Sequence, residues 1–494
     1  MKKRTKRTAG ELAAAMAAGM IGGCANGGNV PEKAVKINYV MPGPGSQQDS
    51  MDVWNKFNEK LQSDGYNISV NFEVIPLSEY KQKFMLMTSA REQVDIANTY
   101  SLDFPSEVRN GTFTALDDLL NEYGKETLKA LPEWFMEYQK IGGKTYGIPT
   151  YQMCANMRAV VFFKDEAEKY LDIDAFKKAL YKKTDLDNKE MYDILEKYME
   201  DLRKAGVKYK DATTLNLKGY DGFTAFYGVK EGEENKVINY ALDGDAKLRY
   251  EVASDWYKKG YIREDIISAK DRGNDMGKIG GYAFWDETWT PFVEKALSEK
   301  YDKPVITIPY SEKYYIARTN TAAGTSITEA CKNKDKAMQL LNLLQTNKDY
   351  YNLLTFGIEG NHYTKTGDDN IKVEYESSPT TNERYGLYKW ITGNTELAYN
   401  IQTEPDEYKK WVFEEVNDSD YRSPLIGFVP DTSKIQDYIT QVSAINGKYY
   451  QTLADGALDD WKAGYEQYKA ELDMVGNQKI IDELQRQVDE FLKK

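Results

Sequence analysis

Residues 34–97 begin with Ala34-Val-Lys-Ile-Asn-Tyr-Val40, in which apolar and polar residues alternate as in a half-buried strand. A helix is predicted next, capped by Ser46, because Phe57 and Leu61 recur at helical spacing. The remainder predicts a strand, a helix and a strand over residues 68–75, 78–90 and 94–97. Strands and helices that alternate in this way predict an α/β fold with a parallel sheet.

Parallel α/β sheets bind ligands at the loops that follow the carboxyl ends of their strands. This rule selects residues 42–47, after the first predicted strand, and residues 98–104, after the third. The second loop contains Tyr100, Ser101 and Asp103. These two loops are therefore the first candidates for a binding site.

The chain has 494 residues, more than one typical core, so at least two domains are expected. It contains 38 Tyr, more than cores usually need, and Tyr suits surfaces that are partly wet and partly apolar. The net charge of −13 at pH 7 is opposite to the positive charge that nucleic-acid-binding proteins use, so no nucleic-acid partner is expected. No apolar run is long enough to predict a membrane span in the mature chain.

The amino terminus has the pattern of a bacterial lipoprotein signal. Five Lys and Arg lie within residues 1–7, a short apolar run covers residues 12–20, and small residues precede Cys24. We expect a signal peptide over residues 1–23 and lipid modification of Cys24. Residues 24–33 then form a polar tether, and the lipid would hold the protein at the outer face of the cytoplasmic membrane.

The remaining cysteines, Cys154 and Cys331, do not form a disulfide framework. A single histidine, His362, and the lack of a C-x-x-C motif argue against a metal site. Both thiols are expected to be buried as small apolar groups. No phosphate-binding loop occurs, so neither a cofactor nor a metal is expected.

Residues 277–292 combine aromatic and acidic side chains. A short strand is predicted at residues 282–284, followed by Trp285, Asp286, Glu287 and Trp289 before a helix begins. The apolar face of a sugar ring stacks on aromatic rings, and its hydroxyls need polar partners. The alternative is a pair of core tryptophans with solvated acids, and the sequence leaves both open.

Later segments extend the α/β pattern. An apolar strand over residues 159–163 should enter a second sheet, because both of its faces are apolar. Helices dominate from there to about residue 275. A strand, a long helix and a tail of three helices follow, over residues 303–309, 335–353 and 424–494.

The order of these motifs resembles the extracellular solute-binding proteins of ABC importers, in the large family that binds sugars and oligosaccharides. The resemblance is carried by the leader, Val94-Asp-Ile-Ala97, Leu116-Asp-Asp-Leu119, Gly143-Lys-Thr-Tyr-Gly-Ile-Pro149, Phe284-Trp285 and Lys334-Asp-Lys-Ala-Met338. Three further stretches are similar to the LipO-like lipoprotein subfamily: residues 352–363, 423–428 and 483–491.

This resemblance implies a two-lobed, periplasmic-binding-protein-like fold of type II, in which closure of the lobes traps the ligand. The first lobe would comprise residues 34–150 plus about 295–350. The second would comprise residues 151–294 plus about 351–422. Residues 423–494 would form added helices. The partners implied are a sugar or oligosaccharide and the membrane permease, and the protein is expected to act as a monomer.

The resemblance also implies positions for the binding site. The contacts expected from it are Pro44, Ser46, Tyr100, Ser101, Asp103, Tyr151, Gln152, Trp285, Asp286, Glu287, Trp289 and His362. Glu359 belongs to the same motif as His362 and would line the cleft or brace the hinge. Structural alternatives stand beside these roles: Tyr151 could pack under the crossing strands, and His362 could be a hydrogen-bonded scaffold residue.

Three other functions compete with sugar binding. An enzyme is disfavoured, because adjacent Asp286 and Glu287 would point to opposite faces of an extended segment and could not flank one bond. Motifs of hydrolases such as G-x-S-x-G and H-E-x-x-H are also lacking. A binder of peptides or another solute, and a sensor for a membrane kinase, both stay open.

Overall fold

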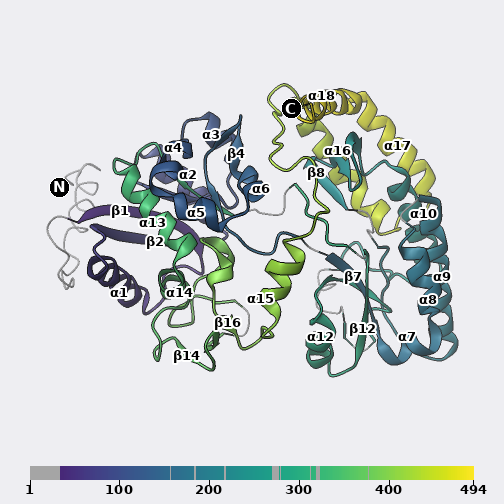
Figure 1. The fold of residues 1–494 in the computed structure, drawn as a ribbon. Coiled ribbons are helices and arrows are strands. Elements are labelled where there is room, and N and C mark those ends of the chain that lie inside the picture. The colour runs from purple at the N-terminus through teal and green to yellow at the C-terminus, as the bar shows by residue number, and fades with distance from the viewer. Residues whose placement is uncertain are drawn as a thin grey trace, which may run out of the picture.

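The computed structural model describes residues 34–493 except 156, 183–184, 216–218, 270–276, 279, 312, 319–322 and 376–377. The predicted signal peptide, tether and Cys24 lie outside the described residues. The described part forms two lobes that lie side by side (Figure 1). No helix within it is both long and apolar enough to cross a membrane.

The first lobe is built on a five-stranded sheet in the order β2-β1-β3-β13-β6. Its strands are β1 (Val35–Gly43), β2 (Ile68–Pro76), β3 (Ile96–Asn98), β6 (Ile148–Pro149) and β13 (Gly324–Ile327). β1 pairs in parallel with β2 and β3, as the alternation of strands and helices predicts. β13 runs antiparallel to both of its neighbours.

The helices of the first lobe bury one apolar face against this sheet. They are α1 (Ser50–Ser63), α2 (Tyr80–Ser89), α3 (Phe104–Arg109), α4 (Asp117–Tyr123), α5 (Lys125–Ala130), α6 (Glu133–Met136), α13 (Lys334–Thr346) and α14 (Lys348–Phe356). α1 begins at Ser50, so exposed Ser46 is not its cap. The helix predicted over 335–353 is two helices, because the Asn347 side chain accepts from Asp349 N–H and caps α14.

The second lobe has an antiparallel sheet in the order β11-β7-β12. Its strands are β7 (Met157–Phe163), β11 (Trp285–Trp289) and β12 (Val305–Pro309). The helices around it are α7 (Lys164–Tyr170), α8 (Ile173–Leu180), α9 (Asp185–Lys204), α10 (Gly244–Lys258) and α12 (Val293–Tyr301). β11 begins three residues later than the predicted strand, which puts both tryptophans of the stretch inside it.

The carboxyl-terminal region forms three helices, as predicted, and shares a core with a small sheet. The helices are α16 (Gln436–Ala454), α17 (Trp461–Met474) and α18 (Asn477–Phe491). The sheet has strands β8 (Tyr220–Thr224), β9 (Tyr227–Lys230) and β10 (Glu233–Asn239). Both belong to one apolar cluster, so these helices extend the second lobe (Figure 1).

The predicted lobe boundaries differ from the structure at two places. β12 pairs with β7, so residues 305–309 lie in the second lobe and not in the first. Tyr350, Tyr385 and Trp411 are buried in the core of the first sheet. Residues 351–416 therefore pack on the first lobe, where they include β14 (Tyr363–Lys365), β15 (Asn370–Val373), β16 (Asn400–Ile401), α15 (Tyr408–Lys410) and the π-helix η4 (Trp411–Val416).

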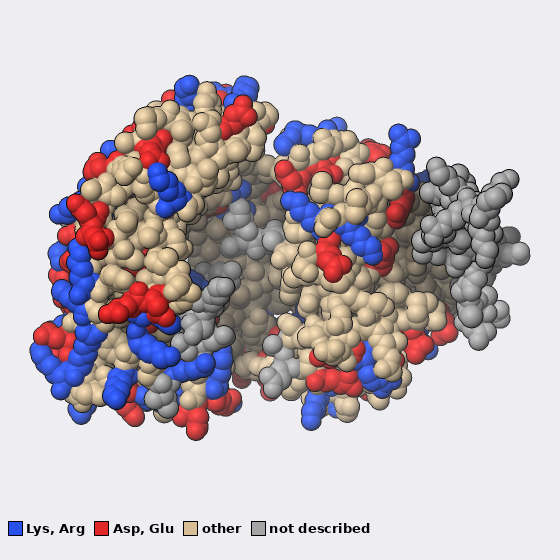
Figure 2. Space-filling view, turned by 180° about the vertical axis from the view of Figure 1, so that it is seen from behind, with Lys and Arg blue, Asp and Glu red and all other residues tan. Residues whose placement is uncertain are grey.

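Three links join the lobes: one between β6 and β7, one between β12 and β13, and one that follows η4 toward α16. Figure 2 shows a hollow between the two halves of the molecule. Hinge-type closure about such links is a standard way to enclose a ligand. The hollow is therefore the place to look for a binding site.

Candidate functional site

Three aromatic side chains of the first lobe contact one another near the first link. Tyr100 follows β3, while Tyr388 precedes the short 3-10 helix η2 (Lys389–Ile391) and Trp390 lies within it. Trp390 stacks on Tyr388, with ring centroids 5.6 Å apart and planes 9° apart, and meets the edge of Tyr100 at 5.0 Å. All three rings are half-buried. We call this group the aromatic ridge.

A buried asparagine holds the two parts of the ridge together. Asn98 ends β3 and is 0% exposed. Its side-chain oxygen accepts from Tyr100 N–H at 2.8 Å, and its amide nitrogen donates to the Ile391 carbonyl at 2.5 Å. A buried amide that is hydrogen-bonded through both its oxygen and its nitrogen fixes backbone positions on both sides. The ridge is thus a preorganised surface.

A cavity on one side of the ridge is lined by residues from both loops that the rule of strand ends selected. This cavity, of about 580 Å³, is lined by residues that include Pro44, Tyr100, Ser101 and Tyr388. Pro44 follows β1 and Tyr100 follows β3, so parallel strands bring the two loops together. Ser101 has a φ of 60°, a left-handed conformation that non-glycine residues seldom adopt outside functional sites and turns.

Ser46 and Asp103 are exposed and are not among the residues that line this cavity. The Asp103 carboxylate accepts from Ser106 N–H at 3.3 Å and so caps α3. A capping role explains this residue without a ligand.

The structure places Trp285 in the core of the second lobe, not in the hollow. It is 0% exposed and packs edge-on against Phe163 and Tyr301, at 5.4 and 5.8 Å. Alternation along β11 turns this ring toward the interior. The core-packing alternative therefore applies to Trp285, and a direct sugar contact is wrong.

Asp286 and Glu287 lie on opposite faces of β11, as expected for neighbours in a strand. The Arg158 guanidinium forms two hydrogen bonds with the Asp286 carboxylate, Nη2–Oδ2 at 2.5 Å and Nε–Oδ1 at 3.2 Å. It also donates to Thr288 Oγ1. Glu287 accepts from Thr288 N–H at 2.9 Å. Both acids are partly exposed, so their remaining lone pairs stay available to a ligand.

Trp289 ends β11 and lies near the links between the lobes. It is half-buried, and its ring centroid is 6.3 Å from Tyr314 in the second link. Tyr314 in turn accepts a hydrogen bond from Trp411 Nε1 at 2.8 Å. Of the two tryptophans in this strand, Trp289 is the one available for contact with a ligand.

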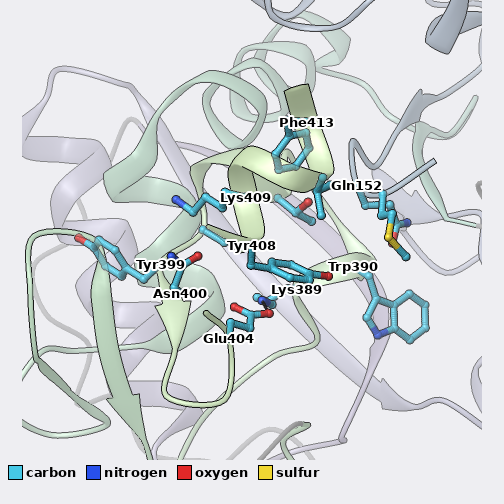
Figure 3. A pocket seen from close by; sticks show the side chains of 13 residues that line it. Gln152, Lys389, Trp390, Tyr399, Asn400, Glu404, Tyr408, Lys409 and Phe413 are labelled. Atoms are coloured by element: carbon cyan, nitrogen blue, oxygen red, sulfur yellow. Dashed lines mark hydrogen bonds and ion pairs between the residues drawn. The ribbon is translucent and has the colours of Figure 1, made fainter. Parts of the chain in front are cut away.

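The first link contributes one buried and one accessible residue. Tyr151 is 6% exposed and packs against Phe135 and Phe413 at 5.0 and 5.1 Å, so the packing alternative describes it. Gln152 is half-buried and lines a second cavity, of about 290 Å³, which also borders Trp390 (Figure 3). The ridge therefore has a cavity on each side.

The structure describes His362 as a hydrogen-bonded scaffold residue, which was the alternative to a ligand contact. It is 3% exposed; its Nδ1 accepts from Ile358 N–H at 2.9 Å, and its Nε2 meets Asp49 Oδ2 at 3.2 Å. Burial raises the pKa of Asp49, but hydrogen bonds from His362 and Arg384 outweigh burial and hold the pKa below its usual value. The cluster ties α14 to the start of α1, away from both cavities. Exposed Glu359 pairs with Lys365 at 3.7 Å.

The described residues contain no group of three or more His, Cys, Asp or Glu that could hold a metal. Cys154 and Cys331 are both buried, as predicted. Burial raises the pKa of Cys331 to about 12, so the thiol is protonated and unreactive at neutral pH.

Two protein-family models match this chain. Residues 44–351 match the model of the bacterial extracellular solute-binding protein family. The chain belongs to that family. Residues 424–493 match a domain of unknown function, DUF3502, which covers the three helices added to the second lobe. The family resemblance predicted from the sequence is confirmed.

Relatives and solved structures match this chain over nearly its whole length. A carbohydrate ABC transporter substrate-binding protein of Streptococcus pneumoniae is 23% identical, with 91% of this chain and 90% of that protein covered. The N-glycan transport solute-binding protein NgtS of S. pneumoniae is 22% identical, with 93% and 99% covered and a TM-score of 0.74. A Bifidobacterium longum infantis protein that binds human milk oligosaccharides (HMO) is 16% identical, with 94% and 100% covered and a TM-score of 0.65. The predicted two-lobed α/β fold is thereby confirmed.

The sequence prediction missed half of the candidate site. Tyr388, Trp390, Tyr408 and Phe413 lie in a segment with few regular elements. The nearness of Tyr388 and Trp390 in the sequence marks an aromatic-rich segment, but a strand-like alternation does not explain their stacking, because Trp390 lies in a 3-10 helix. Their contact with Tyr100 depends on chain folding over 288 residues and could not be read from the sequence.

Proposed function

We propose that this protein captures a sugar or oligosaccharide between its lobes and delivers it to the membrane subunits of an ABC importer, without altering it. The observation that carries this proposal is the aromatic ridge, held rigid by Asn98 between two cavities of a solute-binding fold. Half-exposed rings offer stacking surfaces to sugar rings. Rings fixed before binding lose little entropy when the ligand arrives.

The second lobe would supply the opposing contacts. Glu287 and Trp289 share one face of β11 and offer a carboxylate and an indole near the links, while Asp286 lies on the other face with Arg158. A ligand that touches both lobes only when they are closed favours the closed state. The relative NgtS was solved in complex with Man1GlcNAc and with Man5GlcNAc, at TM-scores of 0.65 and 0.61 to this chain.

The names of the relatives support an oligosaccharide as the ligand class. One relative transports N-glycans, another binds human milk oligosaccharides, and a third, FusA, was solved with kestose. Identities of 15–22% show a shared fold, so the particular sugar is not transferred to this chain.

The decisive test is a thermal-shift screen of purified protein against sugars, peptides and amino acids. A ligand present at 100 times its Kd should stabilise the protein by about 2.7 kcal/mol. We expect stabilisation by oligosaccharides alone. Stabilisation by peptides alone would refute sugar capture, and new reducing ends in the sugar samples would show that the protein is an enzyme.

We also propose that a lipid on Cys24 anchors the protein outside the cytoplasmic membrane, where it acts as a monomer. The basic, apolar and small-residue pattern before Cys24 supports this. In cells fed a labelled fatty acid, the wild type should carry label in the membrane fraction, while Cys24→Ser should carry none. Equal labelling of the two proteins would contradict the anchor.

A further inference from the structure

The smaller cavity beside the ridge has the chemistry of a separate sugar subsite. It lies between the first link and residues 389–413 and is lined by polar and aromatic side chains that include Gln152, Trp390, Tyr408 and Phe413 (Figure 3). Its volume of about 290 Å³ lies at the lower end of the range for ligand pockets.

Three side chains of this cavity offer hydrogen bonds that the protein leaves unused. Within the described residues, the Gln152 amide, the Trp390 indole N–H and the Tyr408 hydroxyl have no hydrogen-bond partner. Burial raises the pKa of Tyr408 to about 12, so its hydroxyl stays protonated and can donate. A polar cavity with several free donors and an amide acceptor suits a ligand rich in hydroxyls.

The charged residues of the cavity are already neutralised. Lys389 forms an ion pair with Glu404, and both side chains are mostly buried, at 24% and 16% exposure. Lys409 pairs with Asp369 at 3.6 Å. An anionic or cationic ligand would have to compete with these pairs, whereas a neutral sugar would not.

The ridge connects this cavity to the larger one. Trp390 lines the smaller cavity, while its stacking partner Tyr388 lines the larger cavity with Pro44 and Tyr100. A chain of sugars that passes over the two stacked rings would reach both cavities. A single sugar would fill only one of them.

We propose that the cavity lined by Gln152, Trp390 and Tyr408 is a subsite for one outer unit of a neutral oligosaccharide, so that the protein selects chains long or branched enough to pass the ridge. This inference rests on the proposed function. It adds a ligand class, neutral and long enough to pass the ridge, and assigns residues that recognise the outer unit.

The test is calorimetric titration with manno-oligosaccharides of one to six units and with Man5GlcNAc. The variants are Tyr408→Phe, which removes one hydroxyl, and Gln152→Ala, which removes the amide. Tyr170→Phe on α7 is the matched control, because it removes a hydroxyl far from the cavity on the second lobe. Thermal melting of each variant checks that its fold is intact.

We expect wild-type affinity to rise with ligand size. Tyr408→Phe and Gln152→Ala should each weaken binding of the largest ligands by about 2- to 10-fold, the range for a net hydrogen bond, and leave short ligands unaffected. Tyr170→Phe should change nothing. Equal losses at every length, or no loss at any length, would overturn the subsite while sugar capture stands. Failure of the wild type to bind any sugar would overturn the proposed function and this inference together.

Discussion

Replacing Trp285 by alanine is expected to lower the free energy of unfolding by about 3–5 kcal/mol, the usual cost of truncating a large core aromatic. The ring is fully buried among Phe163, Tyr301, Leu297 and Val305, so its loss leaves a cavity that the second lobe cannot fill. Urea denaturation followed by circular dichroism measures the change.

Two control variants separate core packing from ligand contact. Trp285→Phe keeps an aromatic ring and removes an indole N–H that has no partner in the described residues, so its cost should be smaller. Trp289→Ala should cost less than Trp285→Ala, because this ring is half-buried. A stable Trp285→Ala protein with lost sugar affinity would contradict the assignment of Trp285 to the core.

Arg318→Ala is expected to cost a similar amount, about 3–5 kcal/mol, because it leaves a buried charge unpaired. Arg318 lies in the second link, and its side chain is 9% exposed beside Asp221, which is 0% exposed. Its Nη2 donates to the Gly222 carbonyl at 2.7 Å and its Nη1 to the Phe428 carbonyl at 3.1 Å. Burial raises the pKa of Asp221 and lowers that of Arg318, and their mutual attraction opposes both shifts.

The contacts of Arg318 join the second link, β8 and the start of the carboxyl-terminal region. The double variant Arg318→Met with Asp221→Asn removes both charges of the pair. The backbone N–H of residue 318 donates to the Asp221 carboxylate, and the asparagine oxygen can still accept this hydrogen bond. We expect the double variant to unfold at a higher urea concentration than Arg318→Met alone, because it leaves no buried charge unpaired. A loss below 1 kcal/mol for Arg318→Ala would refute a structural role for the pair.

Local patterns predicted the elements of the fold, while pairings between distant segments could not be read from them. Alternation over residues 34–40 and helical spacing in α1 are properties of short stretches and were predicted. The partner of β12 is set by contact with β7, more than 140 residues earlier, and no local signal identifies it. That is why residues 305–309 and 351–416 were placed in the wrong lobes.

The binding site shows the same limit. The rule of strand ends found Pro44, Tyr100 and Ser101, because it depends only on strand order. It could not find Tyr388 and Trp390, which reach the site through the Asn98–Ile391 hydrogen bond. The family resemblance suggested Trp285 as a cleft residue, whereas this ring lies in β11 opposite Val161 and packs on Phe163 and Tyr301, contacts that no local pattern shows.

The central claim is that a sugar binds on the aromatic ridge. Its most direct test is calorimetric titration of the wild type and of Trp390→Ala with the sugar that binds most tightly in the screen. Trp390 is half-buried and stacks on Tyr388, so its loss should leave the melting temperature nearly unchanged. We predict that binding weakens by on the order of 1–3 kcal/mol, the usual worth of a central aromatic contact. Equal affinity of the two proteins for the sugar would contradict the account.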